Sequence, residues 1–208
     1  MGLRSPAGVT TRCPADLVTA IRRALRPRGA LGHEGPGGPG VVPGEALRRP
    51  GPVRRGDGQR TALRVAGQLR RHLPDPGMLT PEERRGDADG YLTHVLHAEP
   101  DGSFSIVAMV WLPGQETPVH DHVTWCVSGV LQGTEYEELF TLSEGGTFLR
   151  EAGRNVNRPG DVGGFAPPGD IHRVRNAGDG VAISLHIYGA DITRLGSSIR
   201  RTYDLPAR

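Results

Sequence analysis

The 208-residue chain contains no lysine, and all 25 of its basic residues are arginine. A chain without lysine cannot form a pyridoxal Schiff base, use a lysine general base or build a Walker-type phosphate loop. Its two cysteines, Cys13 and Cys126, are too few for a disulfide framework, which fits a reducing cytosol. The longest apolar run, residues 104–112, is too short to span a bilayer. We therefore expect a cytoplasmic protein without a membrane span or a secretory signal.

Glycine, proline and positive charge are concentrated near the N-terminus. Residues 27–58 hold 10 glycines and 6 prolines, a composition typical of a linker. Residues 1–60 carry 11 arginines against four acidic residues, but no aromatic residue is interleaved with them. We therefore interpret this arm as a solubilising tail and expect no nucleic-acid partner. The predicted organisation is an N-terminal helix with a partly disordered Gly/Pro/Arg-rich linker (1–59), followed by one folded domain (60–208).

Three short helices are predicted before residue 91. Apolar residues at helical spacing indicate one amphipathic helix over residues 15–26 and a second over residues 61–73. The segment TPEE at residues 80–83 combines a capping threonine, a proline at the first helical position and two acidic residues, which predicts a third.

From residue 91 onward, short runs rich in β-branched and aromatic residues alternate with Gly- and Pro-containing turns. These runs cover residues 91–97, 104–112, 119–122, 126–131, 134–141, 161–165, 172–175 and 181–188. Eight strands without a long helix between them predict an all-β antiparallel sandwich or barrel.

Two segments of this β-rich part carry candidate metal ligands. His120 and His122 lie two residues apart, so a strand would turn both imidazoles to the same face. Together with the later segment around His172, their spacing resembles the two motifs of the cupin superfamily, whose small barrels bind a metal inside. The first cupin motif usually has a glutamate where this chain has Cys126. Three neutral imidazoles suit zinc, copper, iron or nickel, and they leave the charge of the ion to attract an anionic ligand such as a thiolate.

A third segment, SLHIY at residues 184–188, places Ser184, His186 and Tyr188 on one face of a late strand. Such a row can form a hydrogen-bond relay that fixes the imidazole tautomer and orients the phenol.

The chain resembles the type I cysteine dioxygenase family, the cupin-fold thiol dioxygenases, over roughly residues 60–208. The matching segments are PVHDH (118–122), Cys126 with LQG (131–133), DIHRVRN (170–176) and SLHIY (184–188). The resemblance implies a cupin double-stranded β-helix, a small jelly-roll barrel, with short N-terminal helices. It also implies a dioxygenase that uses O2 to convert a small thiol into a sulfinate.

The same resemblance assigns site residues. It implies Fe(II) bound by His120, His122 and His172, with Tyr188 as the active-site tyrosine. Ser184 and His186 would form its relay. Cys126 stands where animal members form a thioether with that tyrosine, although it is also of a type that commonly packs in a core.

One position departs from the family pattern. Cysteine-specific members bind the substrate carboxylate through an arginine, in a strand that resembles residues 91–96, where this chain has Thr93 or His94 instead. Relatives that prefer 3-mercaptopropionate use a C-terminal arginine, which corresponds loosely to Arg200 or Arg201. We take His94 and Arg201 as the candidate substrate-binding residues, with cysteine or 3-mercaptopropionate as the expected substrate of a monomeric enzyme. The alternative is a non-catalytic metal-containing cupin that binds or senses a small thiol or anion.

Overall fold

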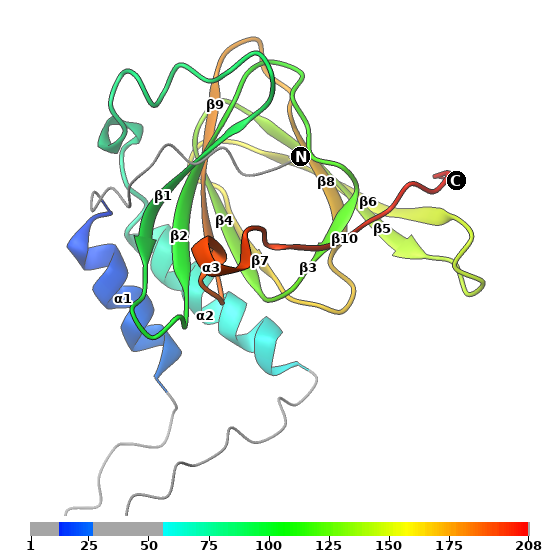
Figure 1. The fold of residues 1–208 in the computed structure, drawn as a ribbon, viewed down its shortest axis with the longest axis horizontal. Helices are drawn as coiled ribbons and strands as arrows, with labels where there is room; N and C mark the ends of the chain where they lie inside the picture. Colours follow the sequence, from blue (N-terminus) through cyan, green and yellow to red (C-terminus); the bar gives the residue numbers. More distant parts are fainter. Residues whose placement is uncertain (1–12, 27–55, 208) are drawn as a thin grey trace, which may run out of the picture.

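The computed structural model describes residues 13–26 and 56–207 (Figure 1). Most of the predicted linker and the first residues of the basic arm lie outside the described residues. Cys13 and Cys126 are both free thiols, and none of the described helices is long and apolar enough to cross a bilayer.

Two antiparallel five-stranded sheets form the body of the protein (Figure 1). In spatial order, the first contains β1 (Leu92–Ala98), β2 (Ser105–Trp111), β9 (Ala182–Tyr188), β4 (Cys126–Gln132) and β7 (Val162–Phe165). The second contains β10 (Ile199–Thr202), β3 (His120–His122), β8 (Ile171–Asn176), β5 (Glu135–Leu142) and β6 (Leu149–Asn157). This arrangement confirms the predicted all-β cupin architecture with short helices.

All eight predicted strands are present, with ends within one residue of those expected. The sequence analysis missed β10 and β6, whose residues are mostly exposed and therefore show no apolar alternation. The helix predicted at residues 80–83 is wrong. Thr80 and Glu83 do exchange capping hydrogen bonds, but only a turn follows, and Gly86 has a φ of +72°. The other short helices of the described chain are a 3-10 helix, Pro76–Met78, and α3, Ile192–Leu195.

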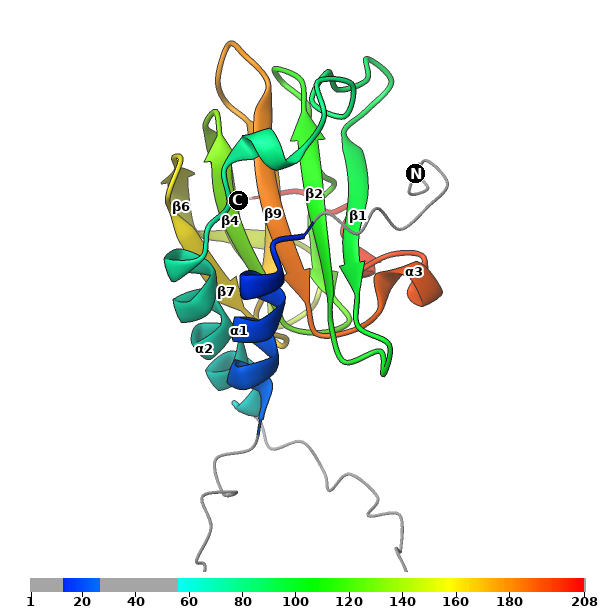
Figure 2. The same ribbon diagram turned by 90° about the vertical axis from the view of Figure 1, so that its left-hand side faces the viewer.

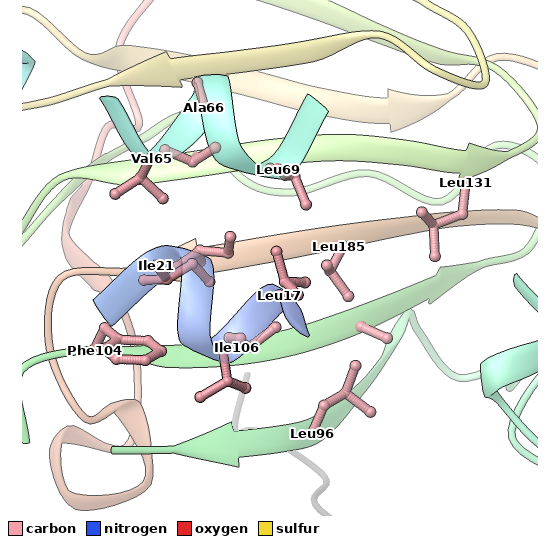
Figure 3. Packing of buried hydrophobic residues seen from close by; sticks show 14 of the residues in the cluster. Leu17, Ile21, Val65, Ala66, Leu69, Leu96, Phe104, Ile106, Leu131 and Leu185 are labelled. Carbon is pink, nitrogen blue, oxygen red and sulfur yellow. The ribbon is translucent and has the colours of Figure 1, made fainter. Parts of the chain in front are cut away.

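Helices α1 (Ala15–Leu25) and α2 (Asp57–Arg71) cover the outer face of the first sheet (Figure 2). Their buried apolar residues pack on the sheet, and Figure 3 shows Leu17, Ile21, Val65 and Leu69 against Phe104, Ile106 and Leu185. Two glycines of the sheet allow this close approach. A Cβ at Gly129 would lie 2.9 Å from Leu73, and one at Gly164 would lie 3.1 Å from the Ala62 carbonyl oxygen.

The N-terminal helix is part of this core. Leu17 and Ile21 are fully buried in the same cluster as the outer face of the first sheet. The domain boundary placed at residue 60 falls inside α2, which begins at Asp57. The described part of the predicted arm therefore contributes to the stability of the barrel.

Strands β2 and β9 are buried on both faces. Their outward residues, such as Ile106 and Leu185, meet the helices, whereas their inward residues form a second cluster inside the barrel with Cys126 and Tyr188. The helices thus allow the polar row of β9 to be held in a dry interior.

We predict that Leu17→Ala lowers the free energy of unfolding by about 2–5 kcal/mol, because it leaves a cavity between α1 and the sheet. Leu63→Ala on α2 is the matched control, since Leu63 is 57% exposed, and it should change stability by less than about 0.5 kcal/mol. Chemical denaturation of both variants measures the difference. Equal effects would show that α1 does not belong to the core.

Candidate metal centre

Three histidines meet inside the barrel. His120 and His122 lie on β3, and His172 lies on β8, directly opposite His120 in the strand register. All three are buried, and their ligand nitrogens lie within 4.8 Å of one another. This spacing allows one metal ion to contact all three rings.

Each imidazole has an oxygen acceptor behind it. The contacts are His120 Nδ1 to the Pro118 carbonyl (2.9 Å), His122 Nδ1 to Asp170 Oδ2 (3.2 Å) and His172 Nδ1 to Glu137 Oε1 (2.7 Å). Each Nδ1–H therefore donates to oxygen, which leaves the lone pair on Nε2 and orients the ring. Three such nitrogens are the donor set that a divalent transition metal requires, so the residues present fit a bound metal ion.

Burial keeps the rings of His120 and His122 uncharged. Loss of hydration, together with the neighbouring histidines, lowers the pKa of His120 to about 3. Burial also lowers the pKa of His122, despite the opposing effect of Asp170. Burial alone would raise the pKa of Glu137, but the hydrogen bond from His172 brings it below the usual range. The centre thus offers neutral nitrogens supported by ionised carboxylates.

The predicted polar row lies beside this cluster. Ser184, His186 and Tyr188 are all buried on β9, and Ser184 Oγ lies 2.9 Å from His186 Nε2. Trp111 Nε1 donates to the same hydroxyl at 3.2 Å. Cys126 is the register partner of Tyr188, and its Sγ lies 4.0 Å from His186 Nδ1. Burial raises the pKa of both Cys126 and Tyr188 well above the ordinary values, so thiol and phenol stay protonated.

A single cavity is lined by the three histidines, His186 and Tyr188. Its remaining polar lining includes Thr93, Ser197 and Ser198. Metal ligation and the hydrogen-bonding row can therefore act on the same small molecule. Among the described residues, no arginine lines this cavity.

The structure does not place His94 or Arg201 at the cavity. His94 lies on the opposite face of β1, where its Nε2 donates to the Glu83 carbonyl at 3.1 Å, and Thr93 lines the cavity instead. Arg201 is 54% exposed and lies 3.3 Å from Asp121, on the outer side of β3. The pairing of β10 with β3 sets this contact, because Arg201 is the register partner of Asp121.

The sequence model of the family described as cysteine dioxygenase type I matches residues 85–196. The chain belongs to this family. The match spans more than half of the chain and includes the three histidines, Cys126 and the row on β9.

Several solved structures are also similar. The protein TT1209 from Thermus thermophilus is 22% identical, over 52% of this chain and 91% of that one, with a TM-score of 0.39. An uncharacterized double-stranded β-helix protein from Klebsiella pneumoniae is 18% identical, over 53% of this chain and 80% of that one, with a TM-score of 0.43. A cupin superfamily protein from Desulfitobacterium hafniense is 17% identical, over 55% of this chain and 86% of that one, with a TM-score of 0.39.

The sequence analysis missed three acidic residues of the site, namely Asp170, Glu137 and Glu135. Asp170 accepts from both the backbone N–H and Nδ1 of His122, while Glu137 and Glu135 line the cavity from β5. The alternation of Glu135 and Glu137 along a predicted strand was a usable signal, because it places two carboxyl groups on one face.

We predict that Glu137→Gln weakens metal binding about 10- to 100-fold, because His172 loses the carboxylate that orients its ring. Glu138→Gln is the matched control, since the adjacent Glu138 pairs with Arg173 outside the barrel, and it should bind metal like the unaltered protein. Competition with a chromophoric chelator, with Zn(II) as the probe, measures both affinities. If Glu137→Gln binds as tightly as the control, Glu137 does not support the ligand.

Proposed function

We propose that this family member is an Fe(II)- and O2-dependent dioxygenase that oxidises the thiol of a small substrate to a sulfinate. One observation carries the proposal: three imidazoles that can hold one metal ion share a cavity with His186 and Tyr188, and the buried Ser184 contacts His186. Both atoms of O2 become bonded to the substrate sulfur, and the thiol proton is released. The oxidation of the sulfur balances the reduction of O2.

The charge of the site supports a thiolate substrate. When bound at His120, His122 and His172, ferrous iron supplies a thiolate-binding position and the redox chemistry of O2 activation. Cys126 stands where the cupin motif usually has a carboxylate, and burial keeps its thiol protonated. The protein therefore adds no anionic ligand of its own from this position, which leaves that role to the substrate.

The polar row positions the reacting groups. Tyr188 forms hydrogen bonds with Cys126 and with Ser198, which lines the cavity. We propose that the Tyr188 hydroxyl orients the substrate, while Ser184 holds the His186 ring in place. Cys126 and Tyr188 are register partners joined by a hydrogen bond, which supports the proposal that a thioether can form between them.

The cavity offers no cationic side chain of the described residues to bind a substrate carboxylate other than through its histidines. Cysteine and 3-mercaptopropionate were predicted as substrates, yet the described cavity lining offers only neutral donors such as Thr93, Ser197 and Ser198. Hydroxyl groups bind a carboxylate less strongly than a guanidinium does. We therefore propose that the thiol, which all small candidates share, is the main anchor.

We predict that the iron-loaded protein oxidises cysteine, 3-mercaptopropionate and cysteamine with kcat/KM values within about tenfold of one another, a spread of about 1.4 kcal/mol. Oxygen uptake and mass spectrometry of the sulfinate measure the reaction, with His172→Ala as the inactive control. A hundredfold preference for the two carboxylates would reveal a cationic site and contradict the thiol-anchor account.

The same panel separates the second candidate function. A metal-containing cupin that binds or senses a thiol is favoured by the missing guanidinium, and it would bind thiols without consuming oxygen. Absence of oxygen uptake and sulfinate with all three thiols would overturn the proposed dioxygenase activity.

A further inference from the structure

Glu135 is a buried carboxyl group that has no cationic partner among the described residues. It lies on β5 with 2% of its surface exposed and lines the same cavity as the three histidines. Within the described part of the chain, its Oε1 atom has no hydrogen-bond partner, while the Ser184 hydroxyl forms a hydrogen bond with the carboxyl group. Burying a carboxyl group in this way destabilises a fold, so its presence beside the polar row calls for a functional reason.

Glu135 extends the row into a chain of five hydrogen-bonding side chains. Ser184 contacts Glu135 and lies 2.9 Å from His186 Nε2. At the other side of the ring, His186 Nδ1 lies 4.0 Å from Cys126 Sγ, and Cys126 hydrogen-bonds to Tyr188. The chain therefore runs from an acid deep in the barrel to the phenol at the metal cavity.

The Ser184 hydroxyl couples the two ends. It has one hydrogen and two lone pairs, and Trp111 Nε1–H occupies one lone pair. If Glu135 is ionised, Ser184 must donate to it and accept from His186 Nε2–H, which leaves Nδ1 bare. If Glu135 is neutral, its hydroxyl donates to Ser184, which then donates to Nε2, and the proton of His186 sits on Nδ1.

The direction of hydrogen-bond donation at His186 also sets the direction at Cys126 and Tyr188. With Nδ1 bare, Cys126 S–H donates to His186, and the Tyr188 hydroxyl donates to the Cys126 sulfur. With Nδ1 protonated, His186 donates to the sulfur and Cys126 S–H turns to the Tyr188 oxygen. The Tyr188 hydrogen is then directed to the cavity side, where Ser198 lies. Ionisation of Glu135 releases one proton, whereas Ser184, His186 and Cys126 each keep one exchangeable hydrogen and only the position of that hydrogen changes.

We propose that Glu135 is a positioning residue whose ionisation sets the direction of hydrogen-bond donation along these five side chains. It thereby decides whether Tyr188 offers a hydrogen or a lone pair to the cavity.

The surroundings of Glu135 allow both states near neutral pH. Burial raises the pKa of Glu135 to about 7, and the nearby Glu137 carboxylate adds to the shift. Seven other titratable groups line the cavity with it, and its register partners Asn157 and Asn176 are uncharged. These groups are His120 and His122 on β3, Glu137 on β5, His172 on β8, His186 and Tyr188 on β9, and Tyr91 just before β1. Burial lowers the pKa of His186 to about 3, so this ring changes tautomer without becoming charged.

Nitrogen-15 NMR of histidine-labelled, Zn(II)-loaded protein tests the proposal, because zinc is diamagnetic and does not support thiol oxidation. The His186 signals are assigned with His186→Gln and followed from about pH 5 to about pH 9. We expect the proton to reside on Nδ1 at low pH and on Nε2 at high pH, with a single transition between the two tautomers and no imidazolium signal.

Three variants complete the experiment. In Glu135→Gln the amide does not titrate, so His186 should keep one tautomer at every pH. Ser184→Ala should also abolish the pH-dependent shift, whereas Glu138→Gln should behave like the unaltered protein. A His186 tautomer that does not change in the unaltered protein, or that still changes in Glu135→Gln, overturns the proposal. Either result leaves the proposed thiol oxidation untouched, because oxygen uptake and sulfinate formation are measured independently of the His186 tautomer.

Discussion

Three oxygen atoms behind three imidazoles determine the chemistry of this protein. The Pro118 carbonyl and the carboxylates of Asp170 and Glu137 hold the Nδ1 hydrogens, so that three Nε2 lone pairs face one point in a buried cavity. Neutral nitrogens bind a divalent ion without neutralising it. In the proposed function, an anion from outside the protein completes the charge balance, and a thiolate fits that role.

The rest of the fold maintains this dry and oriented centre. Strands β2 and β9 bury one face under α1 and α2 and the other inside the barrel, which lets β9 carry Ser184 and His186 without exposing them to water. On the outer side of β3, Asp121 is bound by Arg200, Arg201 and Tyr203 from the C-terminal segment. Strand β3, which carries His120 and His122, is thus held on its outer side by the C-terminal segment and on its inner side by the contacts of the two histidines.

Strand positions and shared faces could be read from the sequence, because both follow from alternation within a short segment. This was sufficient for His120 with His122 and for the row on β9. It failed where a side chain depends on a partner distant in sequence. His94 is one pleat position away from the cavity-lining Thr93, and Arg201 meets Asp121 only because β10 pairs with β3. The roles of Glu137 and Glu135 likewise depend on contacts with β8 and β9.

The most direct test of the central claim is X-ray absorption at the iron edge of the Fe(II)-loaded protein without oxygen, before and after addition of cysteamine. The account predicts nitrogen and water ligands at first, and a new sulfur neighbour of the iron once the thiol is present. An iron environment that gains no sulfur, while the thiol is shown to bind, would contradict it.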